Sequence, residues 1–392
     1  MVACGSGVAV GFDLTRAAVT ATTHALAEID GAVPDLACVF VHGAESDDVT
    51  AALMAASRTA GAAGTIGCTA THGVIGGGHG IEDVSAVSVF VAKLPGVRLR
   101  AFHLEVMRTA DSIAVVGMPD LDGDDQVALV LADAYSFPIE GFVEESDRML
   151  SGLMLAGGMA VGGQGAGSTR LLLDGRVVER GAVGIVLGGG IGVSTMVSQG
   201  CRPVGNPMAV TRVEGNVLLE LAGRPALQRL EDLLLTLSPE DQAIASGGLY
   251  IGVARDEYSD ELEQGDFLVR NIIRVDPERH AIVVNDLVEV GQTMRFQLRD
   301  AGAASVDLVD GLQRWQKRRE LADVKGALLF SCNGRGERFF TTGDHDAVVV
   351  RDGLGGAAVA GYFAAGEIGP VAGRNYLHGF SAAVVAFGTP GR

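Results

Sequence analysis

Short apolar runs separated by glycine-rich and polar turns dominate this chain, and they predict buried β-strands. The runs are rich in valine, leucine, isoleucine and alanine, which is typical of strands covered on both faces. Other stretches have helical periodicity, such as residues 46–60, where Ser46 can cap the first turn. Strands that alternate with helices predict an α/β (α+β) fold, in which helices cover mixed β-sheets.

One order of elements occurs three times, over residues 37–92, 127–187 and 327–387. Each time a strand is followed by a helix, a second strand, a hairpin or glycine-rich turn, and a third strand. This order predicts internal repeats of a strand-helix-strand-hairpin unit. Chance similarity is the alternative, because strand-helix-strand order is common.

The composition of the chain and its predicted elements change between the second and third occurrence of this order. Residues 202–207 contain two prolines and a Gly-Asn pair, which is typical of a domain seam. A helix is predicted to begin near Pro225, followed by an antiparallel meander and a second helix over residues 304–321. We therefore expect two fused halves, residues 1–205 and 206–392. The predicted strands of the meander are 248–253, 267–275, 280–284 and 293–298.

Charge and cysteine content restrict the partners and the location. The chain has 392 residues and a net charge of −18, which argues against a nucleic acid or an anionic membrane as partner. Its five cysteines form no CxxC pair, which suggests reduced thiols and a cytoplasmic location. Residues 1–12 lack the features of a signal peptide. Residues 181–201 are uncharged and long enough to span a membrane, but their seven glycines favour two strands joined by a turn.

Polar residues gather where the last predicted strands end. The strand run 327–332 leads into Cys332-Asn333-Gly334-Arg335-Gly336, and Glu367 follows the run 361–365. Because chemistry in α/β sheets collects where strands give way to loops, these residues indicate a small polar pocket. Arg335 could bind a ligand carboxylate through two hydrogen bonds, or it could close the turn by an ion pair with Asp344 or Asp346.

Glu367 must find a partner if it leaves a buried strand, since an unpaired carboxylate in a low dielectric is costly. The partner could be a ligand ammonium group, Arg335 or backbone N–H groups. His378 could form a hydrogen bond across the same pocket or only cap a loop. In the first repeat, the loop with Cys68, Thr69 and His72 could form a second polar patch or a simple hydrogen-bonded turn.

Several short motifs follow one another in an order that resembles the FIST family of sensory domains, over nearly the whole chain. They are Ile66-Gly67-Cys68-Thr69-Ala70, Val210-Thr211-Arg212, Gly223-Arg224-Pro225-Ala226-Leu227, Gly265-Asp266-Phe267-Leu268-Val269-Arg270, Cys332-Asn333-Gly334-Arg335-Gly336, Gly366-Glu367-Ile368-Gly369-Pro370 and Leu377-His378-Gly379. The resemblance implies a FIST N part, a FIST C part and the sensing of a small molecule, with an amino acid favoured. The candidate ligand-binding residues are Cys332, Asn333, Gly334, Arg335, Gly336, Glu367, His378, Arg212 and Arg270.

The sequence thus predicts a cytoplasmic sensory protein that binds a small polar metabolite. No output domain is recognisable, so we expect the signal to pass through a partner protein or an oligomer interface. A second hypothesis is a cofactor-free thiol hydrolase or transferase with Cys332 as nucleophile, His378 as base and Glu367 as its orienting group. A third is a protein-docking module.

No cofactor or metal is expected. A P-loop is excluded because no lysine follows a glycine. Asp120, Asp122 and Asp124 alternate as in a calcium loop, but Asp125 and Leu131 replace the required glycine and glutamate. We therefore interpret this segment as a solvated acidic turn.

Overall fold

A computed structural model describes residues 1–43, 45–109, 113–150, 152–163, 165–255, 262 and 264–391. The chain divides into two compact units, and the predicted mixed α/β class is confirmed. The core unit contains Met1–Val197 and Leu308–Arg392, and the inserted unit contains Ser198–Asp307. The expected limit between residues 205 and 206 falls inside strand β15 (Cys201–Glu214).

The core unit repeats one supersecondary unit three times, in the predicted order. In each repeat the first two strands are parallel, and the last strand pairs antiparallel with the first. The first repeat contains β2 (Leu36–His42), α2 (Ser46–Ala60), β3 (Gly64–Thr69), β4 (Val74–Gly76), β5 (His79–Ile81) and β6 (Ala86–Lys93). The second contains β9 (Asp125–Asp133), α3 (Ile139–Met149), β10 (Met154–Ala160), β11 (Leu171–Leu173), β12 (Arg176–Val178) and β13 (Ala182–Gly188). The third contains β22 (Leu321–Cys332), α7 (Glu337–Phe340), α8 (His345–Gly353), β23 (Ala358–Ala364), β24 (Glu367–Val371), β25 (Arg374–His378) and β26 (Ala382–Pro390).

Each hairpin joins the sheet of another repeat. The β4–β5 hairpin of the first repeat pairs with β23, the β11–β12 hairpin pairs with β3, and the β24–β25 hairpin pairs with β10. The opposite edges of the three sheets are formed by β1 (Ala3–Val10), by β14 (Gly192–Ser198), and by β7 (Arg98–Arg108) with β8 (Ile113–Val116). This cyclic exchange makes the three repeats one cooperative structure, because each sheet is completed by a neighbour.

Strand register relates the residues of the three repeats to one another. The corresponding rows across the sheets are Phe40–Cys68–Leu171, Leu131–Gly158–Glu367 and Phe330–Tyr362–Val74. Glu367 therefore occupies the position that Leu171 and Val74 fill in the other two hairpins. An aliphatic side chain suits this buried position, so the glutamate calls for an explanation beyond packing.

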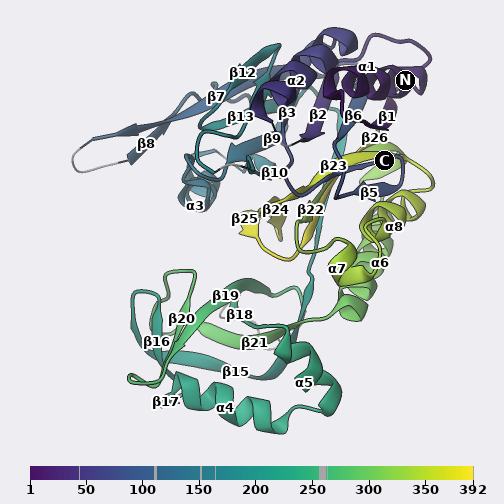
Figure 1. Ribbon diagram of the computed structural model, residues 1–392. Helices are drawn as coiled ribbons and strands as arrows, with labels where there is room; N and C mark the ends of the chain where they lie inside the picture. Colours follow the sequence, from purple (N-terminus) through teal and green to yellow (C-terminus); the bar gives the residue numbers. More distant parts are fainter. Residues whose placement is uncertain are drawn as a thin grey trace. The chain divides into compact units, whose positions relative to one another are not determined.

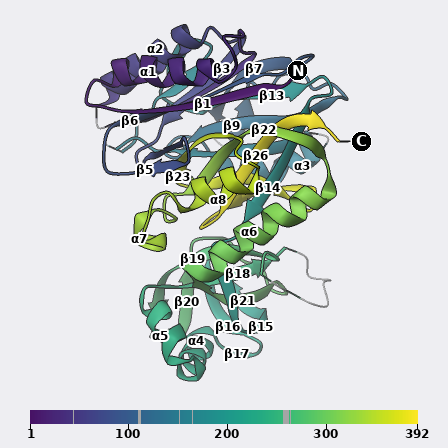
Figure 2. The ribbon, with the colours of Figure 1, turned by 90° about the vertical axis from the view of Figure 1, so that its right-hand side faces the viewer.

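Helices cover the outer faces of the sheets, and the inner faces share one apolar core. Helix α1 (Leu14–Ala27) lies beside α2 over the first sheet (Figures 1 and 2), where both bury their alanine-rich faces. Helix α6 (Ala301–Arg318) and α8 pack on the third sheet in the same way. In the inner core the rings of Phe40 and Phe330 lie 5.0 and 5.7 Å from Tyr362. The loops at the carboxyl ends of the parallel strands are positioned by this core.

Over its described residues, the inserted unit is an antiparallel β structure, as the predicted meander requires, and the complete helices α4 and α5 accompany the strands. Strand β15 pairs with both β21 and β16, which closes the sheet into a barrel. Helix α4 packs on it through Leu227, Leu230 and Leu233. The further elements are β16 (Val217–Leu221), β17 (Arg224–Pro225), α4 (Ala226–Thr236), α5 (Pro239–Ser246), β18 (Leu249–Ala254), β19 (Phe267–Asp276), β20 (Ala281–Val284) and β21 (Thr293–Arg299).

The uncharged window over residues 181–201 forms β13 and β14, so the preference for two strands is confirmed. Within the described part of the chain, the helices all fall short of the length and apolar character that crossing a membrane requires.

Candidate functional site

The predicted site residues divide between the two units. Arg212 and Arg270 lie in the inserted unit, and the others lie in the core unit. Arg212 pairs with Glu220 at 3.2 Å and keeps 60% of its side chain exposed. The Nε atom of Arg270 donates a hydrogen bond to Asp286. Each of these guanidinium groups thus has a carboxylate partner within its own unit.

Arg335 forms a buried ion pair with Asp346. Its Nε and Nη2 atoms donate to the two carboxylate oxygens over 2.7 and 2.9 Å, and Ser331 Oγ donates to the same carboxylate over 2.6 Å. The arginine side chain has no exposed surface. Burial alone would raise the pKa of Asp346, but the Arg335 charge outweighs it and holds this pKa well below its usual range. The sequence left both Asp344 and Asp346 as possible partners of Arg335. In the structure, the guanidinium group pairs with Asp346.

Glu367 lies beside this ion pair and is also fully buried. Its Oε2 atom accepts hydrogen bonds from the Ser381 N–H at 3.1 Å and from Ser381 Oγ at 2.8 Å. Its Oε1 atom has no nitrogen or oxygen partner among the described residues, and the Cys332 thiol lies beside the carboxyl group. Burial raises the pKa of Glu367 to about 8, even though the Ser381 hydrogen bonds, the Arg335 charge and a hydrogen bond from the Cys332 thiol oppose the shift. Most of this carboxyl group is therefore protonated at neutral pH.

A second polar group lies buried in the same core. The Tyr362 hydroxyl finds no nitrogen or oxygen partner within the described ranges, and the weakly polar Cys68 thiol lies beside it. Gly158 pairs with Glu367 in register, and a Cβ atom there would lie 2.8 Å from the Tyr362 hydroxyl. Glycine at position 158 thus leaves space for the tyrosine. Buried polar groups normally have nitrogen or oxygen partners. The Glu367 Oε1 atom and the Tyr362 hydroxyl lack them in the same core, which suggests a functional region.

Cys332 ends strand β22, and burial followed by the nearby Glu367 charge raises its pKa. The next residue, Asn333, lies within 3.5 Å of the His72 ring, so the loops of the third and first repeats meet here. His378 is paired with Glu367 across the hairpin, and its Nε2 atom lies 3.0 Å from the Gly369 carbonyl oxygen. The structure therefore brings Cys332, Arg335 and Glu367 together in a closed polar region.

The burial of Cys332 predicts slow alkylation of the native protein. At pH 7.5 iodoacetamide should modify Cys332 far more slowly than free cysteine, because the thiolate is the nucleophile and its formation is disfavoured. The rate should be unchanged in His378→Ala, and all five cysteines should react in urea. Modification can be followed by mass spectrometry of peptides. Fast labelling that depends on His378 would instead favour the thiol-enzyme hypothesis.

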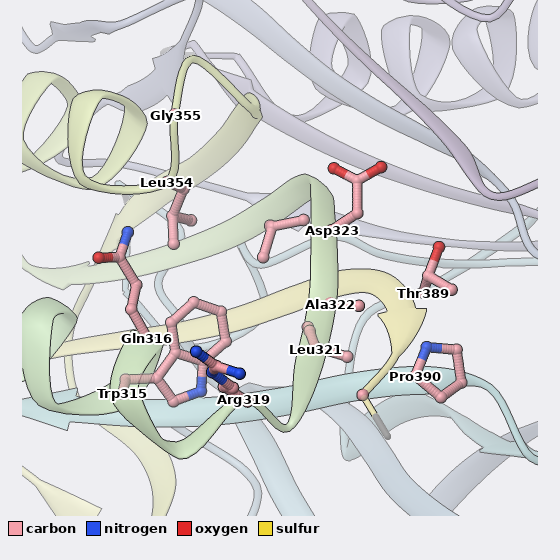
Figure 3. A pocket seen from close by; sticks show the side chains of 12 residues that line it. Trp315, Gln316, Arg319, Leu321, Ala322, Asp323, Leu354, Gly355, Thr389 and Pro390 are labelled. Atoms are coloured by element: carbon pink, nitrogen blue, oxygen red, sulfur yellow. The ribbon is translucent and has the colours of Figure 1, made fainter.

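A pocket of about 860 Å³ lies elsewhere in the core unit (Figure 3). The side chains of Trp315, Gln316 and Arg319 line one side of it, and Thr389 and Pro390 line the other. No predicted site residue is among the described residues that line it. It lies at the amino end of β22, whereas ligands of parallel sheets usually bind at carboxyl ends. Its size alone therefore does not make it the functional site.

A smaller pocket of about 540 Å³ lies at the carboxyl end of β9. Asp133, the last residue of β9, lines it together with Ser136 and His103. The sequence analysis did not select Asp133. The available signal was its position directly after a buried strand run, where Cys332 stands in the third repeat.

The acidic segment after β8 is paired with arginines. Asp122, Asp124 and Asp125 lie close enough together to share a cation. However, Arg98 and Arg100 from β7 form ion pairs with all three carboxylates. These guanidinium groups already balance much of the negative charge.

The fold and the polar strand ends define an α/β protein of two compact units with buried polar groups. The FIST N domain matches residues 35–224, and the FIST C domain matches residues 226–370. The chain belongs to the FIST family, whose domains are associated with sensing and signal transduction.

Relatives of similar length occur in mycobacteria. The chain is 42% identical to the uncharacterized protein Rv0628c of Mycobacterium tuberculosis over 383 residues, which covers 98% of this chain and 99% of the relative. It is 41% identical over 383 residues to the uncharacterized protein Mb0898c of Mycobacterium bovis, with 98% of each chain covered. The similarity therefore extends through both compact units.

Proposed function

We propose that this protein is a cytoplasmic sensor that binds a small polar metabolite, with an amino acid as the favoured class. Membership of the FIST family supports a sensory role. The observation that carries the proposal is the Oε1 atom of Glu367, which is fully buried and has no nitrogen or oxygen partner among the described residues, so that only the weakly donating Cys332 thiol is at hand. A buried polar atom in this condition is costly unless a further group binds it.

In the proposed site, Glu367 gives up its proton to solvent when the ammonium group of the ligand binds, and the two charges then pair. Arg335, held by Asp346, supplies positive charge behind the carboxyl group, and a direct contact with a ligand carboxylate would require it to loosen that pair. Asn333 and His378 orient the ligand, while Cys332, Gly334 and Gly336 form the surrounding wall. Arg212 and Arg270 belong to the inserted unit, where they pair with Glu220 and Asp286, and they are not part of the proposed site.

The closed state of this site suggests how binding could produce a signal. Glu367 and Ser381 have no exposed surface, so a ligand can reach them only if residues 333–336 or 379–381 move. A ligand that binds only the open form shifts the population toward that form. The signal then passes to a partner protein or across an oligomer interface that recognises the changed loops.

A thermal-unfolding screen tests this proposal. The full chain is mixed with amino acids, related metabolites and nucleotides, and a ligand at about a hundred times its dissociation constant should stabilise it by roughly 2.7 kcal/mol. We expect an amino acid to raise the unfolding temperature by a few degrees in the wild type and in the exposed control Glu179→Gln. The shift should be lost in Glu367→Gln. No shift with any compound, or shifts that are equal in all three proteins for every active compound, would contradict the proposal.

A further inference from the structure

The pocket at the carboxyl end of β9 contains a carboxylate oxygen with no partner. Asp133 is 1% exposed, and its Oδ1 atom forms no hydrogen bond with the described residues. Its Oδ2 atom accepts a hydrogen bond from Ser136 Oγ, which in turn accepts one from the Gly181 N–H at 2.9 Å. This chain of hydrogen bonds fixes the carboxyl group, so Oδ1 is held in place for a donor that the described structure does not supply.

The backbone of residues 180–181 is fixed beside this carboxylate by hydrogen bonds. The Asp133 N–H donates to the Gly181 carbonyl oxygen at 2.9 Å, and His103 Nε2 lies 2.9 Å from the Arg180 carbonyl oxygen. Gly181 has a φ of +84°, and a Cβ atom there would lie 2.1 Å from the Leu104 carbonyl oxygen. Only glycine fits this position, so the segment that contacts Asp133 and Ser136 is held rigidly against β7.

Comparison of the three repeats sets Asp133 apart. The central strands β2, β9 and β22 end at His42, Asp133 and Cys332, which correspond because each lies two residues beyond a matched row of the sheets. His42 Nδ1 lies 2.9 Å from the Ala70 carbonyl oxygen, and Cys332 is followed by the buried Arg335–Asp346 pair. In the second repeat the equivalent strand end opens into a pocket of about 540 Å³.

The charges around the pocket indicate what it can bind. Within the described ranges no basic side chain forms an ion pair with Asp133. Glu105 adds a second carboxylate to the lining, and Arg108 and Arg180 add two guanidinium groups. A protonated primary amine matches Asp133 in charge and donor capacity, and the arginines can accept an acidic group at the other end of the ligand.

We propose that the pocket lined by Asp133, Ser136, Glu105, Arg108 and Arg180 is a second binding site, which takes a small metabolite with a primary ammonium group. The ammonium group donates to Asp133 Oδ1, and the arginines favour ligands that also carry a carboxylate. This site differs from the Glu367 region, because its lining comes from β7, the end of β9 with the residues that follow it, the loop after β10 and the segment before β13.

Calorimetric titration of the full chain with β-alanine tests the site, with N-acetyl-β-alanine as the matched compound that lacks the ammonium group. We expect β-alanine to bind and the acetylated compound to bind at least tenfold more weakly. Asp133→Asn keeps the shape and removes the charge, so it should raise the dissociation constant for β-alanine at least tenfold. Glu367→Gln should leave this constant unchanged, which separates this site from the one proposed above.

Ala166 offers a second variant, because it is exposed and lines the pocket. Ala166→Phe should narrow the pocket and weaken β-alanine binding without changing the unfolding temperature. The proposal is overturned if β-alanine does not bind at millimolar concentration, if its acetylated form binds equally well, or if Asp133→Asn and Ala166→Phe both bind like the wild type.

Discussion

Replacing Arg335 by alanine should destabilise the folded protein by about 3–5 kcal/mol, which is the usual result of breaking a buried ion pair. The loss follows from Asp346, which would remain 2% exposed without its principal counter-charge. Ser331 and His345 would still contact the carboxylate, but they cannot replace two hydrogen bonds from a guanidinium group. Urea unfolding followed by circular dichroism measures the change.

Two further variants separate this effect from a general sensitivity to lost arginines. Arg212→Ala removes a surface pair with Glu220 and should cost less than about 1 kcal/mol. The double variant Arg335→Met with Asp346→Leu should recover most of the stability, because it removes both buried charges. If Arg335→Ala were as stable as the wild type, Arg335 would not be needed for the fold. The interpretation that Arg335 binds a ligand carboxylate would then be favoured again.

The second large effect concerns the pH dependence of stability through Glu367. Its pKa in the folded protein is about 8, against a reference value of 4.5, so the folded state binds the extra proton between these values. The contribution of Glu367 to the free energy of unfolding is fully present below about pH 4.5. It falls by about 1.4 kcal/mol for each pH unit up to about pH 8. The variant Glu367→Gln stays neutral and should not show this loss.

The test compares unfolding free energies of wild type and Glu367→Gln from pH 5 to pH 8. Relative to the wild type, the free energy of unfolding of the variant should increase as the pH rises, by a few kcal/mol in all. Other carboxyl groups, including Asp346, affect both proteins alike and cancel in the difference. A difference that stays constant with pH would mean that Glu367 is ionised in the folded protein throughout.

The local elements were predictable because their signals are local. The apolar run before Cys332, which contains Leu328, Leu329 and Phe330, ends at the same residue in the sequence pattern and in β22. The order of the repeats also followed from periodicity and turn residues. The exchange of hairpins could not be predicted, since the pairing of β24 with β10 joins residues that are more than two hundred positions apart.

The candidate site was predictable in part for the same reason. Arg335, Cys332 and Glu367 were selected because they follow buried strands, and the structure brings them together. The sequence could not distinguish Asp344 from Asp346 as the partner of Arg335, because the exact start of helix α8 decides which of the two side chains faces inward. Asp133 was missed, although a carboxylate directly after a buried strand is the same kind of signal that selected Glu367.

The sensory proposal depends most directly on ligand binding at Glu367. The decisive measurement is a calorimetric titration of the full chain at pH 7 with the common amino acids, repeated on Glu367→Gln and on Glu179→Gln. The account predicts that at least one amino acid binds the wild type and Glu179→Gln with the same affinity and binds Glu367→Gln at least tenfold more weakly. No binding by any amino acid, or binding that is unaffected in Glu367→Gln for every amino acid that binds, would contradict it.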